Sequence, residues 1–308
     1  MYYFYNRMPI ATADDLVSYI KTNWINFKMT KENALKIQYK LLPYCMTDND
    51  KKYAYCYVIH RAKDKFNLNT AFSLINDLVR DKYVPAYVLL GNAYYYGWGT
   101  PKNTDKAFEW YLKAHNAGYA VGTFNCALSY YDKKDFPTMR KYIDLAISMG
   151  YPQASRLKGD GYLYGRYGYP ENEAKAIEYY NQASNLGCEL AQYRLGVCYK
   201  NGYGVPVNHT KALDYFEKAA MFDVDDAQLK VAVYYLDGIH TRKFPEKAIY
   251  YLELAVELEN YTAMALAGHC YMQGIGCDKD YFKGMELIRK SAFKGDELGK
   301  KYLAKYNI

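Results

Sequence analysis

One stretch decides the fold: residues 191–220 read AQYRLGVCYKNGYGVPVNHTKALDYFEKAA. Its first half spaces Ala191, Leu195 and Tyr199 four residues apart, which is the spacing of one face of an α-helix. Gly202 follows where a helix commonly ends on a left-handed residue. The second half repeats the helical spacing after a loop proline, which helps to start a helix. The stretch therefore predicts two helices joined by a glycine-rich loop.

The same frame recurs along the chain at nearly constant distance. The leading alanines are spaced by 34, 34, 37, 36 and 36 residues, at Ala86, Ala120, Ala154, Ala191, Ala227 and Ala263. The copy that starts at Ala120 is the most degenerate, because Asp132, Lys133 and Lys134 replace its loop glycines. A single hairpin of this kind cannot bury its own apolar face, whereas stacked hairpins share a continuous core. The period predicts an all-α fold of stacked helix–loop–helix repeats of 34–37 residues.

Small residues inside the predicted helices indicate close packing. Gly91 lies in mid-helix, where glycine costs about 1 kcal/mol relative to alanine. We expect the partner helix to approach closely at this position. Tyr is unusually abundant, with 39 of 308 residues, and the same frame position holds Tyr94, Tyr162, Tyr199, Tyr235 and Tyr271. Core packing accounts for these rings better than a platform that stacks nucleic-acid bases.

This frame, Ala-x3-Leu-Gly-x2-Tyr-x2-Gly-x-Gly followed by Lys-Ala-x2-Tyr/Trp-x3-Ala, resembles the Sel-one-like repeat, a relative of the tetratricopeptide repeats. The resemblance implies a right-handed α-solenoid, or superhelix. It divides the chain into six Sel-one-like repeats over residues 84–295, preceded by a diverged first repeat at 51–83 and followed by a C-terminal capping helix at 296–308. Residues 1–50 do not show this frame and are of unknown type; they are expected to be helical, with candidate helices at 13–25 and 30–42.

The resemblance also implies a binding surface, because related arrays line a concave groove with their first helices. Counting from the Leu-Gly pair, the groove-facing positions lie two before the Leu, two after it and five after it. The candidate partner-binding residues at these positions are Tyr95, Arg156, Tyr193, Val197, Leu229, Val233, Leu236, His269 and Met272. The C-terminal part of this ladder is apolar, which favours an amphipathic helix or apolar peptide as ligand. The alternative is that these residues pack on one another or on the capping helix.

The sequence offers no set of residues for catalysis. The five histidines do not stand at metal-ligand spacing, and the seven cysteines form no C-x-x-C pair. No phosphate-binding loop and no nucleophile elbow occurs. We therefore expect no catalytic residue, no metal and no cofactor. An odd cysteine count without an even framework favours a reducing compartment.

The leading hypothesis is a non-enzymatic, cytoplasmic scaffold or adaptor that binds a partner protein or peptide, with delivery into a host cell left open. One alternative is a weak hydrolase, as described for a few relatives of the family. Another is an adaptor for a membrane surface or a nucleic acid, acting through residues 1–83, which hold five of the seven net positive charges. The basic residues there are dispersed, so nucleic acid is the weaker interpretation. We expect no secretory signal and no transmembrane segment.

Overall fold

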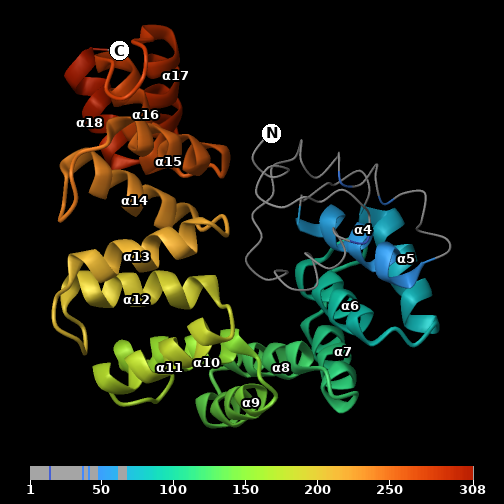
Figure 1. Cartoon of the computed structure of the whole chain (residues 1–308). Helices are drawn as coiled ribbons and strands as arrows, with labels where there is room; N and C mark the ends of the chain where they lie inside the picture. Colours follow the sequence, from blue (N-terminus) through green and yellow to red (C-terminus); the bar gives the residue numbers. More distant parts are fainter. Residues whose placement is uncertain (1–13, 15–36, 38–40, 42–47, 62–67, 308) are drawn as a thin grey trace. The chain divides into compact units, whose positions relative to one another are not determined.

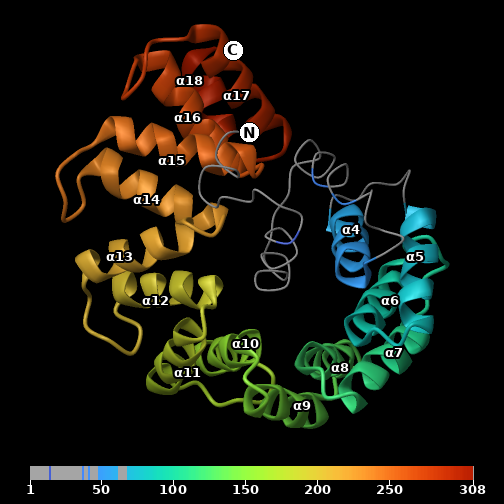
Figure 2. The ribbon, with the colours of Figure 1, turned by 45° about the vertical axis from the view of Figure 1, so that its right-hand side comes forward.

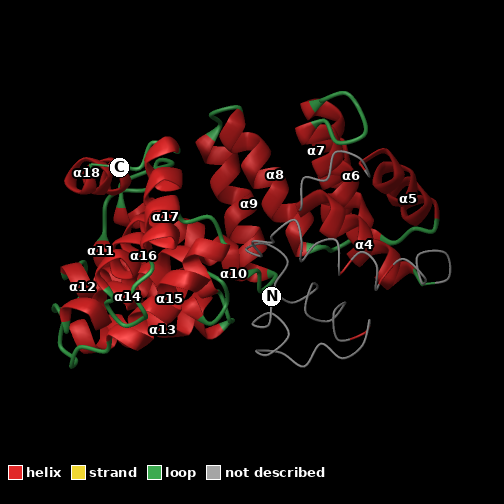
Figure 3. Cartoon of the chain, turned by 90° about the horizontal axis from the view of Figure 1, so that it is seen from above, coloured by secondary structure: helices red, strands yellow, loops and turns green. Residues whose placement is uncertain are grey.

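The computed structural model describes residues 14, 37, 41, 48–61 and 68–307. Every regular element assigned to these residues is an α-helix, which confirms the all-α class (Figure 3). The helices expected at 13–25 and 30–42 lie outside the described part of the chain, apart from three single positions.

The chain divides into two compact units (Figure 1). Unit 1 ends with residues 165–170, and unit 2 begins with residues 162–164. The helices of unit 1 are α4 (Asn49–Arg61), α5 (Leu68–Arg80), α6 (Val84–Tyr96), α7 (Thr104–Asn116), α8 (Ala120–Asp132) and α9 (Phe136–Ser148), and α10 (Pro152–Leu163) reaches the boundary. Those of unit 2 are α11 (Glu173–Asn185), α12 (Glu189–Asn201), α13 (His209–Ala220), α14 (Asp225–Asp237), α15 (Pro245–Glu257), α16 (Tyr261–Gln273), α17 (Tyr281–Phe293) and α18 (Glu297–Tyr306).

Within each unit, helices that follow one another in sequence pack against one another. In unit 2 the pairs α12–α13, α14–α15 and α16–α17 are joined by contacts between each second helix and the next first helix (Figure 2). In unit 1 the same alternation runs from α4 to α9. This is the solenoid arrangement of stacked hairpins. The boundaries given above for a diverged repeat, six regular repeats and a cap remain predictions, and helices occupy each of these ranges.

The mid-helix glycines allow the close approach that the sequence predicts. A Cβ added to Gly91 would lie 2.4 Å from Cε1 of Tyr111, and one added to Gly196 would lie 2.6 Å from the ring of Phe216. Both aromatic residues come from the second helix of the same repeat and are buried. The expectation of close packing at Gly91 is confirmed, since the space of a methyl group is already filled by the partner ring.

The two glycines of each Gly-x-Gly loop have different roles. The first ends a helix in the left-handed region, as at Gly202 with φ of 83°, which confirms the predicted C-terminal role. The second lies against the preceding repeat. A Cβ on Gly204 would lie 2.7 Å from the carbonyl oxygen of Glu173, and one on Gly276 would lie 2.2 Å from that of Pro245. The Gly-x-Gly loop is therefore also an inter-repeat contact.

Side-chain caps start the second helices. Asn208 accepts a hydrogen bond from the backbone N–H of Lys211 at 2.9 Å, and Asp280 does the same for Lys283. Asn103, Asp135 and Asn172 hold the equivalent positions. Such a cap satisfies one of the free N–H groups of the first helical turn. The Asn208 of a glycosylation sequon thus has a structural role in this fold.

The frame tyrosines pack under lysines of their own repeat. The Lys that begins each Lys-Ala or Lys-Gly pair places its Nζ 3.9–5.4 Å from the ring centroid, over Tyr94, Tyr162, Tyr199, Tyr235 and Tyr271. The hydroxyl group of Tyr235 donates a hydrogen bond to Glu217 at 2.7 Å. This cation–π arrangement explains the abundance of Tyr over Phe, because each ring needs an apolar body and a polar end.

Candidate functional site

The two predicted site residues of unit 1 are engaged within their unit. Tyr95 on α6 donates a hydrogen bond from its hydroxyl group to Asp132 Oδ2 at 2.6 Å. This bond raises the pKa of Tyr95 to about 12, with partial burial adding to the effect. Arg156 on α10 pairs with Asp160 at 2.5 Å, and both side chains are largely buried. These residues pair locally and offer little free surface.

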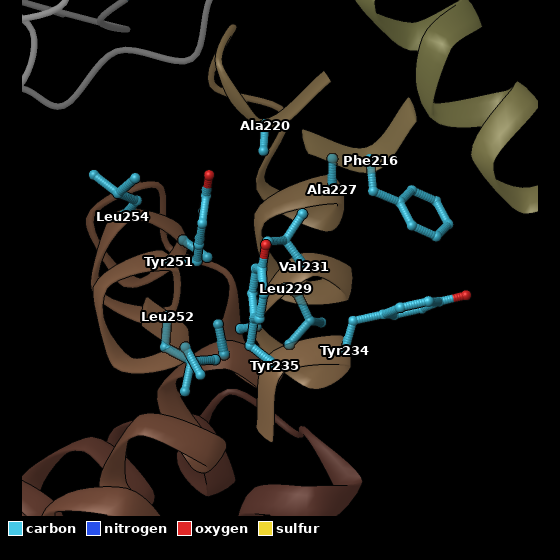
Figure 4. Close-up of a cluster of buried hydrophobic side chains, with 14 of the residues drawn as sticks. Phe216, Ala220, Ala227, Leu229, Val231, Tyr234, Tyr235, Tyr251, Leu252 and Leu254 are labelled. Atoms are coloured by element: carbon cyan, nitrogen blue, oxygen red, sulfur yellow. The ribbon is translucent and has the colours of Figure 1, made fainter. Parts of the chain in front are cut away.

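The predicted site residues of unit 2 separate into buried and partly exposed groups. Leu229 and Met272 are 8% and 6% exposed. Figure 4 draws Leu229 among the side chains of the unit 2 core, with Val231 and Tyr235 of the same helix. Tyr193, Val197, Val233 and Leu236 are partly buried against this core. Leu229 and Met272 therefore pack within the unit, as the alternative interpretation of the ladder predicts. Val197 and Val233 remain candidates for contact with a partner.

A partly exposed stripe on the first helices shares Val197, Val233 and His269 with the predicted ladder and differs from the ladder at its other positions. On α14 it consists of Asp226, Lys230, Val233 and Asp237, which recur at i, i+4, i+7 and i+11. This is one face of an α-helix. The residues on the two other first helices are equivalent, and we call the set the first-helix face of unit 2: Leu190, Arg194, Val197, Asn201, Asp226, Lys230, Val233, Asp237, Thr262, Leu266, His269 and Gln273.

The C-terminal helix covers the last part of this face. His269 stacks on Tyr302 of α18 with ring centroids 4.7 Å apart, and its Nδ1 is 2.5 Å from the hydroxyl group of Tyr306. Gln273 donates to the same hydroxyl group at 3.1 Å. Burial lowers the pKa of His269, and the nearby Lys305 lowers it further. His269 therefore acts as a packing residue under α18, whereas Val197 and Val233 remain partly exposed.

Two lysines lie near these valines in the sequence of the first helices. Lys200 lies three residues after Val197 on α12, and Lys230 lies three residues before Val233 on α14. Burial lowers the pKa of Lys230, the ammonium group of Lys200 lowers it further, and Asp226 acts in the opposite direction. Lys200 occupies one of the counted groove positions, five residues after Leu195, whereas Lys230 lies one residue after the counted position Leu229.

Several cysteine and histidine side chains are engaged in packing contacts within the described repeats. Burial raises the pKa of the Cys126 and Cys270 thiols to about 12, which keeps both protonated and unreactive. His209 and His240 stack on one another, and the Nδ1 atom of His209 lies 3.0 Å from the Tyr234 hydroxyl group. Among the residues that the structure covers, no group of three or more side chains is placed to hold a metal ion.

A shallow polar hollow of unit 2 lies between the end of one repeat and the start of the next. Its lining includes Asp225, Asn260, Thr262 and Asp296. Asn260 donates to Asp225 at 3.0 Å, and Thr262 donates to Asp296 at 2.7 Å. These polar groups satisfy one another and start the first helices, so the hollow is a capping structure.

None of the helices in the described ranges combines the length and the apolar character that a membrane span requires.

Comparison with known proteins identifies the repeat. The model of the Sel1 repeat matches residues 84–119, 159–188, 190–221, 225–260 and 262–296, more than half of the chain. The matched segments leave out residues 120–158, where the frame is most degenerate. In that gap α8 and α9 form a helical pair.

A curated relative and two of the solved structures illustrate what the chain is similar to. A putative sel1-like repeat-containing protein, L21 of Acanthamoeba polyphaga mimivirus, is 33% identical over 113 residues, which is 37% of this chain and 21% of that protein. The chain thus matches about a fifth of that relative's length.

A Sel1 repeat protein from Oxalobacter formigenes superposes with a TM-score of 0.66 at 24% identity, covering 75% of this chain and 99% of that one. The protein c5321 of uropathogenic Escherichia coli, described as a protective antigen with an SLR fold, gives a TM-score of 0.62 at 24% identity, covering 96% of this chain and 59% of the other. At this identity the two structures support the fold, and the repeat matches carry the assignment: the chain belongs to the Sel1 repeat family.

Proposed function

We propose that the protein is a non-enzymatic interaction scaffold and that a partner protein binds along the first-helix face of unit 2. Members of the Sel1 repeat family are commonly protein-interaction scaffolds. The observation that carries the proposal is the repeated, partly exposed valine at Val197 and Val233, flanked by residues that are buried. Repeat arrays typically present such recurring positions to an extended ligand. Apolar side chains that remain accessible at equivalent places of successive repeats are candidates for partner contact.

The polar groups of the described repeats support binding rather than catalysis. Lys247 and Lys283 pair with Glu217 and Glu253 of the preceding repeat at 2.8 and 3.0 Å. The capping Asn and Asp side chains bind backbone N–H groups. A catalytic site requires a nucleophile, a base and an electrophilic group in mutual contact. The groups above instead hold helices and repeats together.

We propose a reducing, intracellular location for this scaffold. The six cysteines in the described ranges are free thiols, and five of them are buried in helical packing. Buried cysteines of this kind behave as small apolar residues. The pattern differs from that of secreted repeat proteins whose disulfides recur in every repeat.

The test uses a photo-activated cross-linker placed on two sides of unit 2. We would introduce p-benzoylphenylalanine in place of Val233 on the first-helix face, or in place of Phe282, which is 82% exposed on the second helix α17. The proposal predicts a discrete cross-linked partner from Val233 and none from Phe282. A partner captured from Phe282 alone would contradict it.

A substitution pair then tests whether the contact stabilises the complex. Val233→Asp should remove the cross-linkable partner, and because the side chain is only partly buried it should lower the thermal stability of the array less than the same substitution of the buried Leu229 would. Phe282→Asp is the matched control, because it makes the same kind of change at an exposed site. Leu229 is unsuitable for this test, since its side chain belongs to the core.

A further inference from the structure

We propose that the outward face of α17 binds the surface of a membrane that contains anionic lipids, with Phe282 and Phe293 entering the lipid and Arg289 and Lys290 contacting the headgroups. The inference goes beyond the proposed function and does not depend on it, because it concerns another face of unit 2. Its starting point is the exposure of the two phenylalanines, 82% and 88%, the two highest values among the large apolar side chains that the structure describes.

The two phenylalanines lie on one side of α17. Phe282, Arg289 and Phe293 recur at i, i+7 and i+11, which places them on a single face of an α-helix. Gly284 and Ile288 are buried and mark the opposite side of the same helix. The phenyl rings therefore extend away from the core, with their backbone positions about 16 Å apart along the helix axis.

The other repeats form without a phenyl ring at either position. Counted from the N-cap Asp280, Phe282 is the second residue and Phe293 the thirteenth. In α7, α9, α11, α13 and α15 the residues equivalent to Phe282 are Asp105, Pro137, Ala174, Thr210 and Glu246. Those equivalent to Phe293 are Asn116, Ser148, Asn185, Met221 and Glu257. Packing of the repeat stack therefore does not account for the two phenylalanines.

The charge of the outward face is also reversed relative to the preceding repeats. Arg289 is the ninth residue after the N-cap, and in α13 and α15 this position holds Glu217 and Glu253. Each of these glutamates pairs with the lysine of the following repeat, at 2.8 and 3.0 Å. Within the described ranges Arg289 forms no ion pair, so its charge is available to an external anion.

Phenyl rings beside cations are typical of a segment that lies in the interface of an anionic membrane. Lys290 follows Arg289, Lys294 follows Phe293, and Glu286 is the one acidic residue of α17. Rings of this kind enter the boundary between headgroups and acyl chains, while basic side chains attract anionic headgroups. The face thus matches a lipid surface in both apolar character and charge.

A second copy of the chain fits this face less well. A symmetric contact would bring the cations Arg289 and Lys290 of two copies together. A stable protein interface buries about 800 Å² on each partner, whereas one aromatic side chain buries about 150–250 Å². A lipid surface accepts each ring separately, so the small apolar area of this face is sufficient for it.

The experiment measures sedimentation of the full chain with lipid vesicles. One set consists of phosphatidylcholine with about 30% phosphatidylserine, and the other of phosphatidylcholine alone. We expect binding to the anionic vesicles and little to the neutral ones. Phe282→Ser/Phe293→Ser and Arg289→Gln/Lys290→Gln should each weaken binding to the anionic vesicles by about tenfold or more.

Matched control variants make the same changes elsewhere in unit 2. Val207→Ser/Met221→Ser removes two apolar side chains that are 56% and 60% exposed, and Lys218→Gln/Lys243→Gln removes two exposed positive charges. Both controls should bind the anionic vesicles as the parent chain does. Equal weakening by a test variant and its control would show general adsorption and overturn the inference.

A tryptophan substitution reports whether the ring enters the lipid. Phe293→Trp should retain vesicle binding and add fluorescence that brominated lipids quench, whereas the added fluorescence of Val207→Trp should be unaffected. Unquenched fluorescence from Phe293→Trp would overturn the inference, as would equal sedimentation with neutral vesicles. A dimer in solution that Phe282→Ser/Phe293→Ser dissociates, without vesicle binding, would assign the face to contacts between copies and also overturn it.

The inference and the proposed function fail separately. Val233→Asp should bind the anionic vesicles as the parent chain does, because Val233 lies on the first-helix face. If no vesicle binding is found while Val233 cross-links a partner protein, the membrane inference is wrong and the scaffold proposal stands. If vesicles bind through Phe282 and Phe293 while Val233 captures no partner, the scaffold proposal is wrong and the inference stands.

Discussion

The hairpins α8–α9 and α16–α17 both pack into a stack of repeats, but they do so with different residues. The loop of α16–α17 is long, places Gly274 and Gly276 at positive φ and packs on the preceding repeat. In α8–α9 only Lys133, Lys134 and Asp135 separate the two helices. The family model matches α16–α17 and leaves out α8–α9. The hairpin therefore does not depend on the signature loop.

The two hairpins share a pattern of buried small and apolar residues, which we call the buried lattice. Ala146 of α9 and Ser291 of α17 hold equivalent positions and are fully buried, as are Ile143 and Ile288 one turn earlier. Where α16–α17 has a Lys–Tyr–Glu contact, α8–α9 has ring contacts. Tyr130 stacks on Tyr142 with centroids 5.5 Å apart. The comparison shows that the small and apolar positions fix the stack, while loops and polar contacts can vary.

The largest expected effect tests this shared lattice. Ile143→Ala and Ile288→Ala each remove a side chain that is at most 1% exposed, so each should lower the free energy of unfolding by about 3 kcal/mol. Chemical denaturation followed by circular dichroism measures both. A cost at Ile143 far below that at Ile288 would mean that α8–α9 is packed loosely and only resembles its neighbours.

Substitutions in the loops of the two hairpins should differ in their cost to stability, whereas substitutions in the two cores should have similar costs. Gly276→Ala brings a Cβ within 2.2 Å of the Pro245 carbonyl oxygen at φ of 71°, and we expect a loss of roughly 3 kcal/mol from clash and backbone strain. Gly150, which follows α9, has φ of 77° and no neighbour within 4 Å of an added Cβ. Gly150→Ala should cost only about 1 kcal/mol. Equal costs in thermal unfolding would show that the loop contact contributes nothing.

The polar contact of α16–α17 should have a smaller effect. Tyr271→Phe removes a hydroxyl group that accepts from Lys283 at 2.5 Å and donates to Glu253. Because these groups are partly solvated, we expect a loss of about 1 kcal/mol or less. Tyr131→Phe on α8, where the ring is 44% exposed, is the control and should change stability by less than about 0.5 kcal/mol. If Tyr131→Phe lost more stability than Tyr271→Phe, this tyrosine hydroxyl group would matter more in α8–α9 than its counterpart does in α16–α17.

The smallest expected effect is a pH dependence of stability that comes from α16–α17 and not from α8–α9. His269 on α16 has a pKa lowered below 6.5 by burial and by Lys305, whereas α8 contains no histidine. The unfolded chain therefore binds more protons at His269 than the folded chain, and stability should fall as the pH falls through about 6.5. Thermal unfolding between about pH 7.5 and about pH 5.5 measures this loss.

His269→Gln should reduce that pH dependence, and Cys126→Ala should leave it unchanged. Since His269 stacks on Tyr302, the effect should be confined to the C-terminal end of the array. Hydrogen exchange of α18 would report the same change locally. An unaltered pH profile in His269→Gln would show that other groups control the acid sensitivity.

Much of the fold could be predicted because its cause is local and repeated. The spacing of Ala191, Leu195 and Tyr199 predicts a helix without reference to any other segment. Gly91 predicts a close neighbour, and Tyr111 fills that space. The capping residues, such as Asn208, follow an equally regular pattern and were overlooked only because the sequence analysis did not examine that frame position.

The candidate site was less predictable because exposure depends on how a helix is rotated against its neighbours. One residue along a helix is a rotation of about 100°, so neighbouring positions of the same helix can differ in exposure. Leu229 is buried, while Lys230, the next residue, lies on the partly exposed face. His269 lies on the same face, yet α18 covers it.

The sequence by itself determined that the chain folds as stacked helical hairpins, because period, small residues and helix ends are all encoded within each repeat. The tertiary structure alone decided which side of the first helices stays accessible. It also partly buried Lys230, which lowers the pKa of its ammonium group, and the charge of Lys200 lowers it further. Neighbouring helices set both properties, since burial and electrostatic repulsion depend on distances between side chains that no single repeat contains.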